Sequence, residues 1–227
     1  MKSNTLLCGI VTMILACLAA PAGARAAPTA DARLTYRGFV AGAPVGEATV
    51  TVAVVDGRYR VAGDARSNGV LIVFGNWRNR FSAEGRLQGT ERHPEAFAYT
   101  ESDRSKTRRV VVSDGELRVT KNGKLRPTRT APAFPDLISA LFVQPRCDDG
   151  QILHTGRHVY RLNRIEHEAA SCRFTVIDDD DDSFELDLFL VRHDDLLVPQ
   201  KIIVRGWLTG WIELMETSAP SRPAQAR

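Results

Sequence analysis

The chain has 227 residues and a formal net charge of +3 at pH 7. A charge this close to zero lacks the electrostatic footprint of a nucleic-acid-binding protein, so we expect no nucleic-acid partner. The length fits a leader segment followed by one domain, because all-β sandwiches and barrels of about 200 to 250 residues are often undivided.

The first residues predict export. Lys2 precedes a stretch without charged residues, 3–24, whose end overlaps the run Ala24-Arg25-Ala26-Ala27-Pro28. A positive start, a short apolar core and an Ala-X-Ala exit are typical of a secretory signal peptide. We therefore predict a signal peptide over residues 1–26, cleavage after about Ala26 and a periplasmic location. A lipoprotein that begins at Cys17 is the less favoured alternative, and no later apolar stretch is long enough to span a bilayer.

After cleavage, 28 basic and 27 acidic residues would remain, a net charge of +1. We expect residues 27–216 to form one antiparallel β domain. Residues 33–130 contain short alternating segments separated by turn signals, the pattern of a sandwich or barrel. The signals include a turn over 42–46 and the pairs Asp56-Gly57 and Asp114-Gly115, which favour tight hairpins. Such local connections predict a meander in which neighbouring strands pair.

One segment departs from this alternation. Residues 135–143 carry apolar side chains at helical spacing, with Pro135 at the start and Asp136 suited to the positive end of a helix. We expect a single short helix packed against the sheet.

Two cysteines, Cys147 and Cys172, lie beyond the predicted signal peptide. In an oxidising compartment such an isolated pair favours a disulfide. A metal-binding or redox pair would need the closer spacing of a C-x-x-C motif.

The C-terminal part returns to strands. Residues 184–190 place four apolar side chains on one face and Glu185 and Asp187 on the other, where Phe189 follows. Pro199 is expected to open a strand over 201–205, and another strand is expected over 211–215. Residues 217–227 are rich in Pro, Ala and Ser and predict a disordered tail.

Several of these segments together resemble a bacterial exported family known as domain of unknown function 3108, over about Leu34 to Met215. The segments that carry the resemblance are Tyr36 with Gly38, Gly46-Glu47-Ala48, Asp56-Gly57-Arg58-Tyr59, Gly85-Arg86-Leu87 before Pro94, Asp136-Leu137-Ile138-Ser139-Ala140-Leu141, and His193-Asp194-Asp195 through Pro199-Gln200-Lys201-Ile202. The resemblance implies a curved antiparallel sheet like that of periplasmic lipoprotein carriers. It implies no activity, because fold does not determine function.

Two clusters invite a metal hypothesis. The run Asp178–Asp182 offers the carboxylates that calcium prefers, but Ser183 and Phe189 occupy the positions where an EF-hand loop needs Gly and Glu. His154 and His158, near Asp148 and Asp149, have the i, i+4 spacing of zinc ligands on a helix, but Gly156 and the following strand pattern argue against a helix there. We expect a solvated hairpin tip and a polar loop instead, with no metal and no cofactor.

The sequence also predicts no catalytic residue. A G-x-S-x-G elbow is absent, and the predicted disulfide removes both cysteines as nucleophiles. His93, His167 and His193 lie in unrelated strand or turn settings. We therefore expect a protein that is not an enzyme.

Two features favour a binding role. The stretch around Arg104, Lys106, Arg108 and Arg109 is rich in cations and could attract anionic headgroups at a membrane surface. Its alternative role is to protect an edge hairpin from pairing with other chains. Further cations follow at Arg118, Lys121, Lys124, Arg126 and Arg129.

The second feature is a surplus of bulky apolar residues, which would line a cavity in an incompletely closed sheet or simply fill a core. The residues expected at such a cavity are Val73, Phe74, Trp77, Trp207 and Trp211. Our prediction is a mostly β protein with one curved antiparallel sheet, a half-barrel or barrel-like meander, and one short helix. Its predicted role is to bind or carry an apolar or lipid-like ligand in the cell envelope. An envelope structural protein that binds other proteins is the alternative.

Overall fold

The computed structural model describes residues 30–68, 77–206 and 208–218. The predicted signal peptide, Val73, Phe74 and Trp207 lie outside these residues. Fifteen strands and one helix make up the described part of the chain. The strands are β1 (Ala30–Val40), β2 (Ala43–Val55), β3 (Arg58–Ser67), β4 (Arg78–Gln88), β5 (Glu91–Ser102), β6 (Thr107–Ser113), β7 (Glu116–Lys121), β8 (Lys124–Leu125), β9 (Arg129–Thr130), β10 (Gln151–His154), β11 (Val159–Glu168), β12 (Ser171–Asp178), β13 (Ser183–His193), β14 (Leu196–Arg205) and β15 (Thr209–Ser218).

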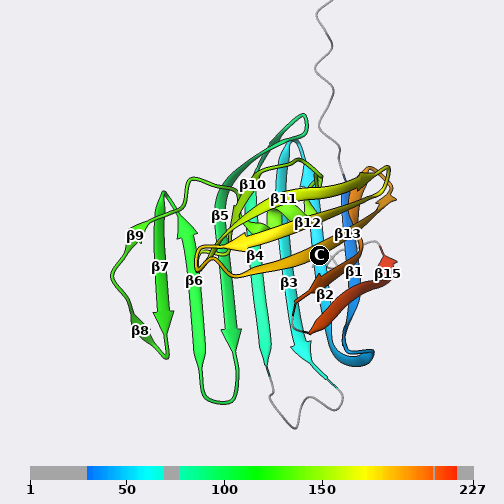
Figure 1. The fold of residues 1–227 in the computed structure, drawn as a ribbon. Coiled ribbons are helices and arrows are strands. Elements are labelled where there is room, and N and C mark those ends of the chain that lie inside the picture. The colour runs from blue at the N-terminus through cyan, green and yellow to red at the C-terminus, as the bar shows by residue number, and fades with distance from the viewer. Residues whose placement is uncertain (1–29, 69–76, 207, 219–227) are drawn as a thin grey trace, which may run out of the picture.

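All strands belong to one antiparallel sheet. Its order is β10-β11-β12-β13-β14-β15-β1-β2-β3-β4-β5-β6-β7-β8, with β9 also paired to β7. Apart from β9, each strand therefore pairs with a neighbour in sequence, and the pairing of β1 with β15 joins the two runs. The sheet curls so that β10–β13 cross in front of β3–β5, as Figure 1 shows. The strands at its two ends do not pair with each other, so the sheet is curved but not closed.

The helix α1 (Leu137–Phe142) lies inside the curl, between the two crossing parts of the sheet (Figure 1). Asp136 caps its N-terminus: its carboxylate accepts hydrogen bonds from the Ser139 backbone N–H at 2.8 Å and from the Ser139 hydroxyl at 2.7 Å. Arg92 from β5 caps the other end by donating to the carbonyl oxygens of Val143 and Gln144, both at 2.7 Å. Within the described residues no helix is long and apolar enough to cross a membrane.

Two apolar cores meet at this helix. The first is formed mainly by β1–β7 and includes Phe142, whereas the second is formed mainly by β10–β14 and includes Ala140. Leu141 and Ile212 pack against both cores. The helix therefore lies where the two cores adjoin.

A disulfide joins Cys147, which follows the helix, to Cys172 on β12. Cys172 is almost fully buried in the second core. The disulfide predicted for this isolated pair is therefore present, and it ties the connection that carries α1 to the strands that cross over it.

The predicted fold class is confirmed: the protein is mostly β, with one curved antiparallel sheet and one short helix. Three details of the prediction were wrong. The turn expected over 42–46 occupies Ala41 and Gly42 instead, because a bulge beside Phe39 lets β2 start at Ala43. Pro199 does not open a strand but lies within β14, where a bulge between Phe189 and Leu190 accommodates it. β15 continues to Ser218, so the first two residues of the predicted tail pair with β1.

Candidate functional site

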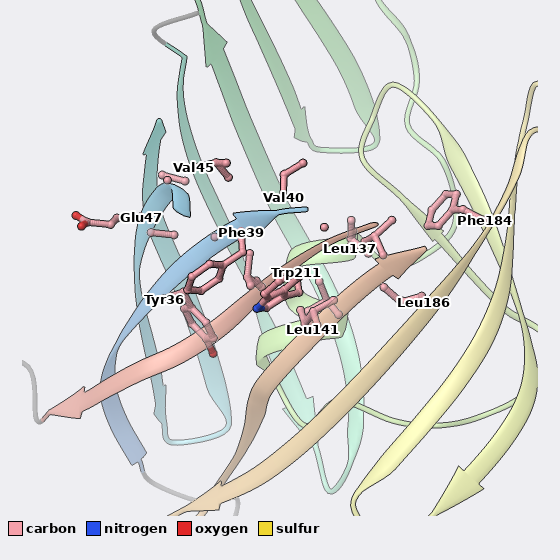
Figure 2. Close-up of a pocket in the computed structure, with 18 of the residues that line it drawn as sticks. Tyr36, Phe39, Val40, Val45, Glu47, Leu137, Leu141, Phe184, Leu186 and Trp211 are labelled. Carbon is pink, nitrogen blue, oxygen red and sulfur yellow. The ribbon is translucent and has the colours of Figure 1, made fainter. Parts of the chain in front are cut away.

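The main candidate site is an apolar cavity where the two cores adjoin. Its volume is about 490 Å³, within the range of about 300 to 1,000 Å³ that is common for small-molecule sites. Leu137 and Leu141 from the helix line one side, and Leu186 of β13 lies across from them, as Figure 2 shows. The remaining walls come from β1–β3, β11, β12, β14 and β15. The cavity therefore exists because the sheet curls over the helix without the side chains filling the space.

One wall depends on the absence of a side chain. The Trp77 ring lies close over Gly46 of β2, and a Cβ at position 46 would be only 2.7 Å from the Arg66 carbonyl oxygen. Trp77 is held in place by β3, because its backbone N–H donates to the Ser67 hydroxyl at 3.1 Å. Any larger residue at position 46 would displace β3 or Trp77. Gly46 thus sets the width of the cavity beside β2 and β3.

Two polar side chains at the lining have partners within the protein. The Tyr36 hydroxyl donates a 2.8 Å hydrogen bond to the Pro199 carbonyl oxygen, and burial raises the pKa of this hydroxyl. Glu47 is the one carboxylate among the described lining residues, and it forms an ion pair with Arg66 at 3.6 Å. The cavity can therefore accept apolar groups, and its described lining presents no free acid or base to them.

Of the predicted cavity residues, Trp77 and Trp211 line the cavity. The Trp211 ring stacks on Phe39 with 5.1 Å between ring centroids, and Lys201 lies over it at 5.5 Å. The cavity is also lined by Leu137 and Leu141 of the helix and by the strand residues Leu162, Phe184 and Leu186, which were not predicted there. Their spacing marks them as buried, but it does not show that they leave a space between them.

The predicted basic patch does not form one surface. Neighbouring residues of a strand point to opposite faces, so Arg108 shares its face with the buried Val110, whereas Arg109 points to the exposed side. Arg104 and Lys106 lie on the hairpin connection before β6. Arg108 forms an ion pair with Glu101 at 3.7 Å.

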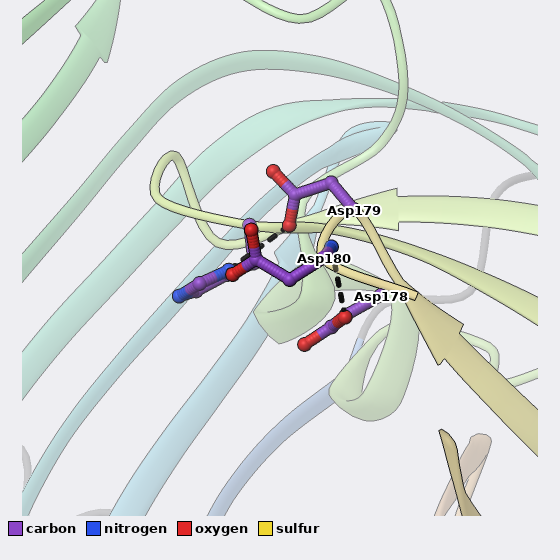
Figure 3. A group of neighbouring side chains, drawn as sticks. Asp178, Asp179 and Asp180 are labelled. Atoms are coloured by element: carbon purple, nitrogen blue, oxygen red, sulfur yellow. Dashed lines mark hydrogen bonds and ion pairs between the residues drawn. The ribbon is translucent and has the colours of Figure 1, made fainter. Parts of the chain in front are cut away.

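The acidic run forms the turn between β12 and β13. Asp178 stabilises this turn by accepting hydrogen bonds from the backbone N–H groups of Asp180 and Asp182, both at 3.0 Å. His158 reaches the same turn, and its Nδ1 lies 2.9 Å from Asp179 (Figure 3). One ligand atom each from His158, Asp178, Asp179 and Asp180 lies within 4.8 Å of the others, which is close enough to share a cation. The hydrogen bonds of the turn and the contacts of His158 with Asp179 at 2.9 Å and with Asp180 at 3.9 Å account for all four residues without a cation.

The residues considered for zinc separate in the structure. His154 is buried on β10, where its Nδ1 accepts a hydrogen bond from the Gly156 N–H at 3.0 Å, and burial lowers its pKa. Asp148 pairs with Arg146, and Asp149 accepts a 2.7 Å hydrogen bond from the Arg164 N–H. These residues therefore stabilise the connection between the helix and β11.

Comparisons with known proteins inform the fold alone. No family model matches the chain. No curated protein matches it either. Among solved structures, the chain is similar to a β-barrel-like protein of domain of unknown function DUF1849 from Brucella abortus, with a TM-score of 0.52 and 10% sequence identity. The similarity covers 86% of this chain and all of that protein. The match supports a β-barrel-like architecture and assigns no activity.

Proposed function

We propose that this protein is a non-enzymatic protein of the bacterial cell envelope that binds one apolar ligand, such as an acyl chain, in the cavity between its two cores. The observation that carries the proposal is the cavity itself, about 490 Å³ with an almost entirely apolar lining. An unfilled apolar space of this size is costly for a protein to maintain, since interiors are otherwise close-packed. A ligand that transfers apolar groups from water into it would gain about 0.8 kcal/mol per CH₂.

A periplasmic location is part of this proposal. The export signal predicted for residues 1–26 supports it, and the Cys147–Cys172 disulfide is compatible with an oxidising compartment. Membership of the domain of unknown function 3108 family likewise stays a prediction from the motifs given above.

The test uses saturated fatty acids of increasing chain length, with binding followed by tryptophan fluorescence, since Trp77 and Trp211 line the cavity. We expect the affinity to rise by about fourfold per CH₂ until the cavity is full. Native mass spectrometry of protein purified from the periplasm should show a bound apolar molecule.

A matched pair of variants on β3 makes the test specific. Ala65 lines the cavity, whereas Ala62 is exposed on the opposite face of the same strand. The Ala65→Phe substitution should fill the cavity and abolish binding, and Ala62→Phe should leave binding unchanged. Equal affinities of the two variants, or an absence of binding to the unmodified protein, would refute the proposal. Recovery of a stoichiometric protein partner in the absence of fatty-acid binding would favour the envelope interaction role instead.

A further inference from the structure

A second depression, of about 200 Å³, is surrounded by cations. It lies on the face of β6–β9 that is continuous with the first core, and its floor is formed by Val110, Val119 and Gly156. Its other lining residues are all basic: Arg108, Lys121, Arg126, Arg129 and Arg157. Elsewhere this face of the sheet packs apolar side chains, so a concentration of positive charge here departs from the rest of the fold.

The strand register places two of these cations side by side. Arg108 of β6 and Lys121 of β7 are direct cross-strand partners, so their side chains project from the same face. Like charges in this arrangement destabilise a sheet. Arg129 is brought to the same face by its pairing with the buried Leu117. The register thus gathers cations where repulsion between them costs stability.

The turn between β10 and β11 adds the fifth cation. Gly156 has a positive φ of 71°, and a Cβ there would lie 2.5 Å from a methyl group of Val110. The turn therefore packs directly on β6 because residue 156 has no side chain. This close packing places Arg157, which follows in the turn, at the edge of the depression.

Negative charge in this region is sparse. Glu101, which pairs with Arg108 at 3.7 Å, is the one carboxylate within ion-pair distance of these five residues in the described part of the chain. The excess positive charge, the small concave shape and the several guanidinium groups fit a compact anion with several oxygens. Guanidinium groups can donate paired hydrogen bonds to such an anion, and the oxygens of a phosphate suit this geometry.

We propose that this basic depression is a phosphate-binding site. A bound phosphate would offset the repulsion between Arg108 and Lys121 and would link β6 and β7 to the turn that carries Arg157. The proposal does not depend on the apolar cavity. The phosphate can belong to a soluble anion or to a lipid headgroup, and the two sources call for separate measurements.

The experiment compares two double variants with equal changes in net charge. Lys121→Ala with Arg157→Ala removes two cations of the depression. Arg109→Ala with Arg118→Ala removes two cations from the opposite, exposed face of the same hairpin. Binding of inorganic pyrophosphate is measured by calorimetry at low salt. Binding to phosphatidylcholine vesicles with and without phosphatidylglycerol is measured by flotation.

We expect the first double variant to lose roughly 25-fold in affinity, the effect of two cations that each contribute about 1 kcal/mol near an anionic surface, and the second to lose little. Selective loss with pyrophosphate supports a soluble phosphate ligand, and selective loss confined to phosphatidylglycerol vesicles supports a headgroup. Equal losses in the two double variants would show that the effect depends only on net charge and would overturn the proposal. The proposal would also be overturned if the unmodified protein bound neither pyrophosphate nor the phosphatidylglycerol vesicles.

Discussion

Removing the disulfide offers a quantitative test of how the helix connection is held. Replacing Cys147 and Cys172 together by alanine opens a loop whose ends are 25 positions apart in sequence. In the chain-entropy model, a cross-link of this span stabilises the folded state by roughly 3.5 kcal/mol, because it restricts the unfolded chain. For a domain of this size the loss corresponds to a melting temperature lower by roughly 7 to 14 °C.

The assay is urea unfolding followed by tryptophan fluorescence, for the unmodified protein with and without reductant and for the double alanine variant. The reduced protein and the variant should lose similar amounts, since both release the same constraint. A larger loss in the variant would show that the packing of Cys172 in the second core contributes as well. A loss below about 1 kcal/mol in both would refute the cross-link reasoning.

Three further changes test other parts of the fold. Tyr36→Phe leaves the buried Pro199 carbonyl oxygen without its donor and should lower the free energy of unfolding by about 1 to 3 kcal/mol in urea titrations; no change would show that water replaces the hydroxyl. Burial alone would raise the pKa of Asp187, but hydrogen bonds from Arg173 and Arg205 hold this pKa below its usual value. Asp187→Asn should therefore lower the free energy of unfolding by about 1 to 3 kcal/mol at pH 7. The difference from the unmodified protein should shrink as the pH falls below about 4. Burial lowers the pKa of His154, so the folded protein takes up a proton on this ring less readily than the unfolded chain does and should lose stability as the pH falls below about 6.5. His154→Gln should reduce this dependence of stability on pH. An identical profile for the variant would show that His154 is not the group responsible.

The local pairings of the sheet could be predicted from the sequence. The Asp56-Gly57 and Asp114-Gly115 pairs form hairpin turns with positive φ angles, as their residue types require. The helix was predictable from its spacing, and Asp136 indeed lies at its start. The pairing of β1 with β15 was not predictable, because strands so distant in sequence carry no turn signal that joins them.

The candidate site was only partly predictable. Trp77 and Trp211 were expected at a cavity because they are bulky, yet bulk alone does not distinguish a lined space from a filled core. The gap depends on how far the sheet curls over Leu137 and Leu141, which is a property of the whole fold. The basic depression was hidden for a related reason: Arg157 lies far along the chain from the β6–β9 cations, and only the packing of Gly156 on Val110 brings it near.

The strand order has a consequence for the connectivity of the molecule. Because β1 and β15 are adjacent in the sheet, a short linker between their outer ends would turn the order into one uninterrupted meander from β10 to β8. A circular permutant whose new ends lie between β9 and α1 would then keep every strand pairing. It would cut the connection that runs from β9 through α1 to β10, at the other end of the sheet. Apart from the pairing of β9 with β7, its sheet would form through neighbouring hairpins. A comparison of its refolding rate with that of the natural order would measure how much the long-range closure of β1 on β15 slows assembly.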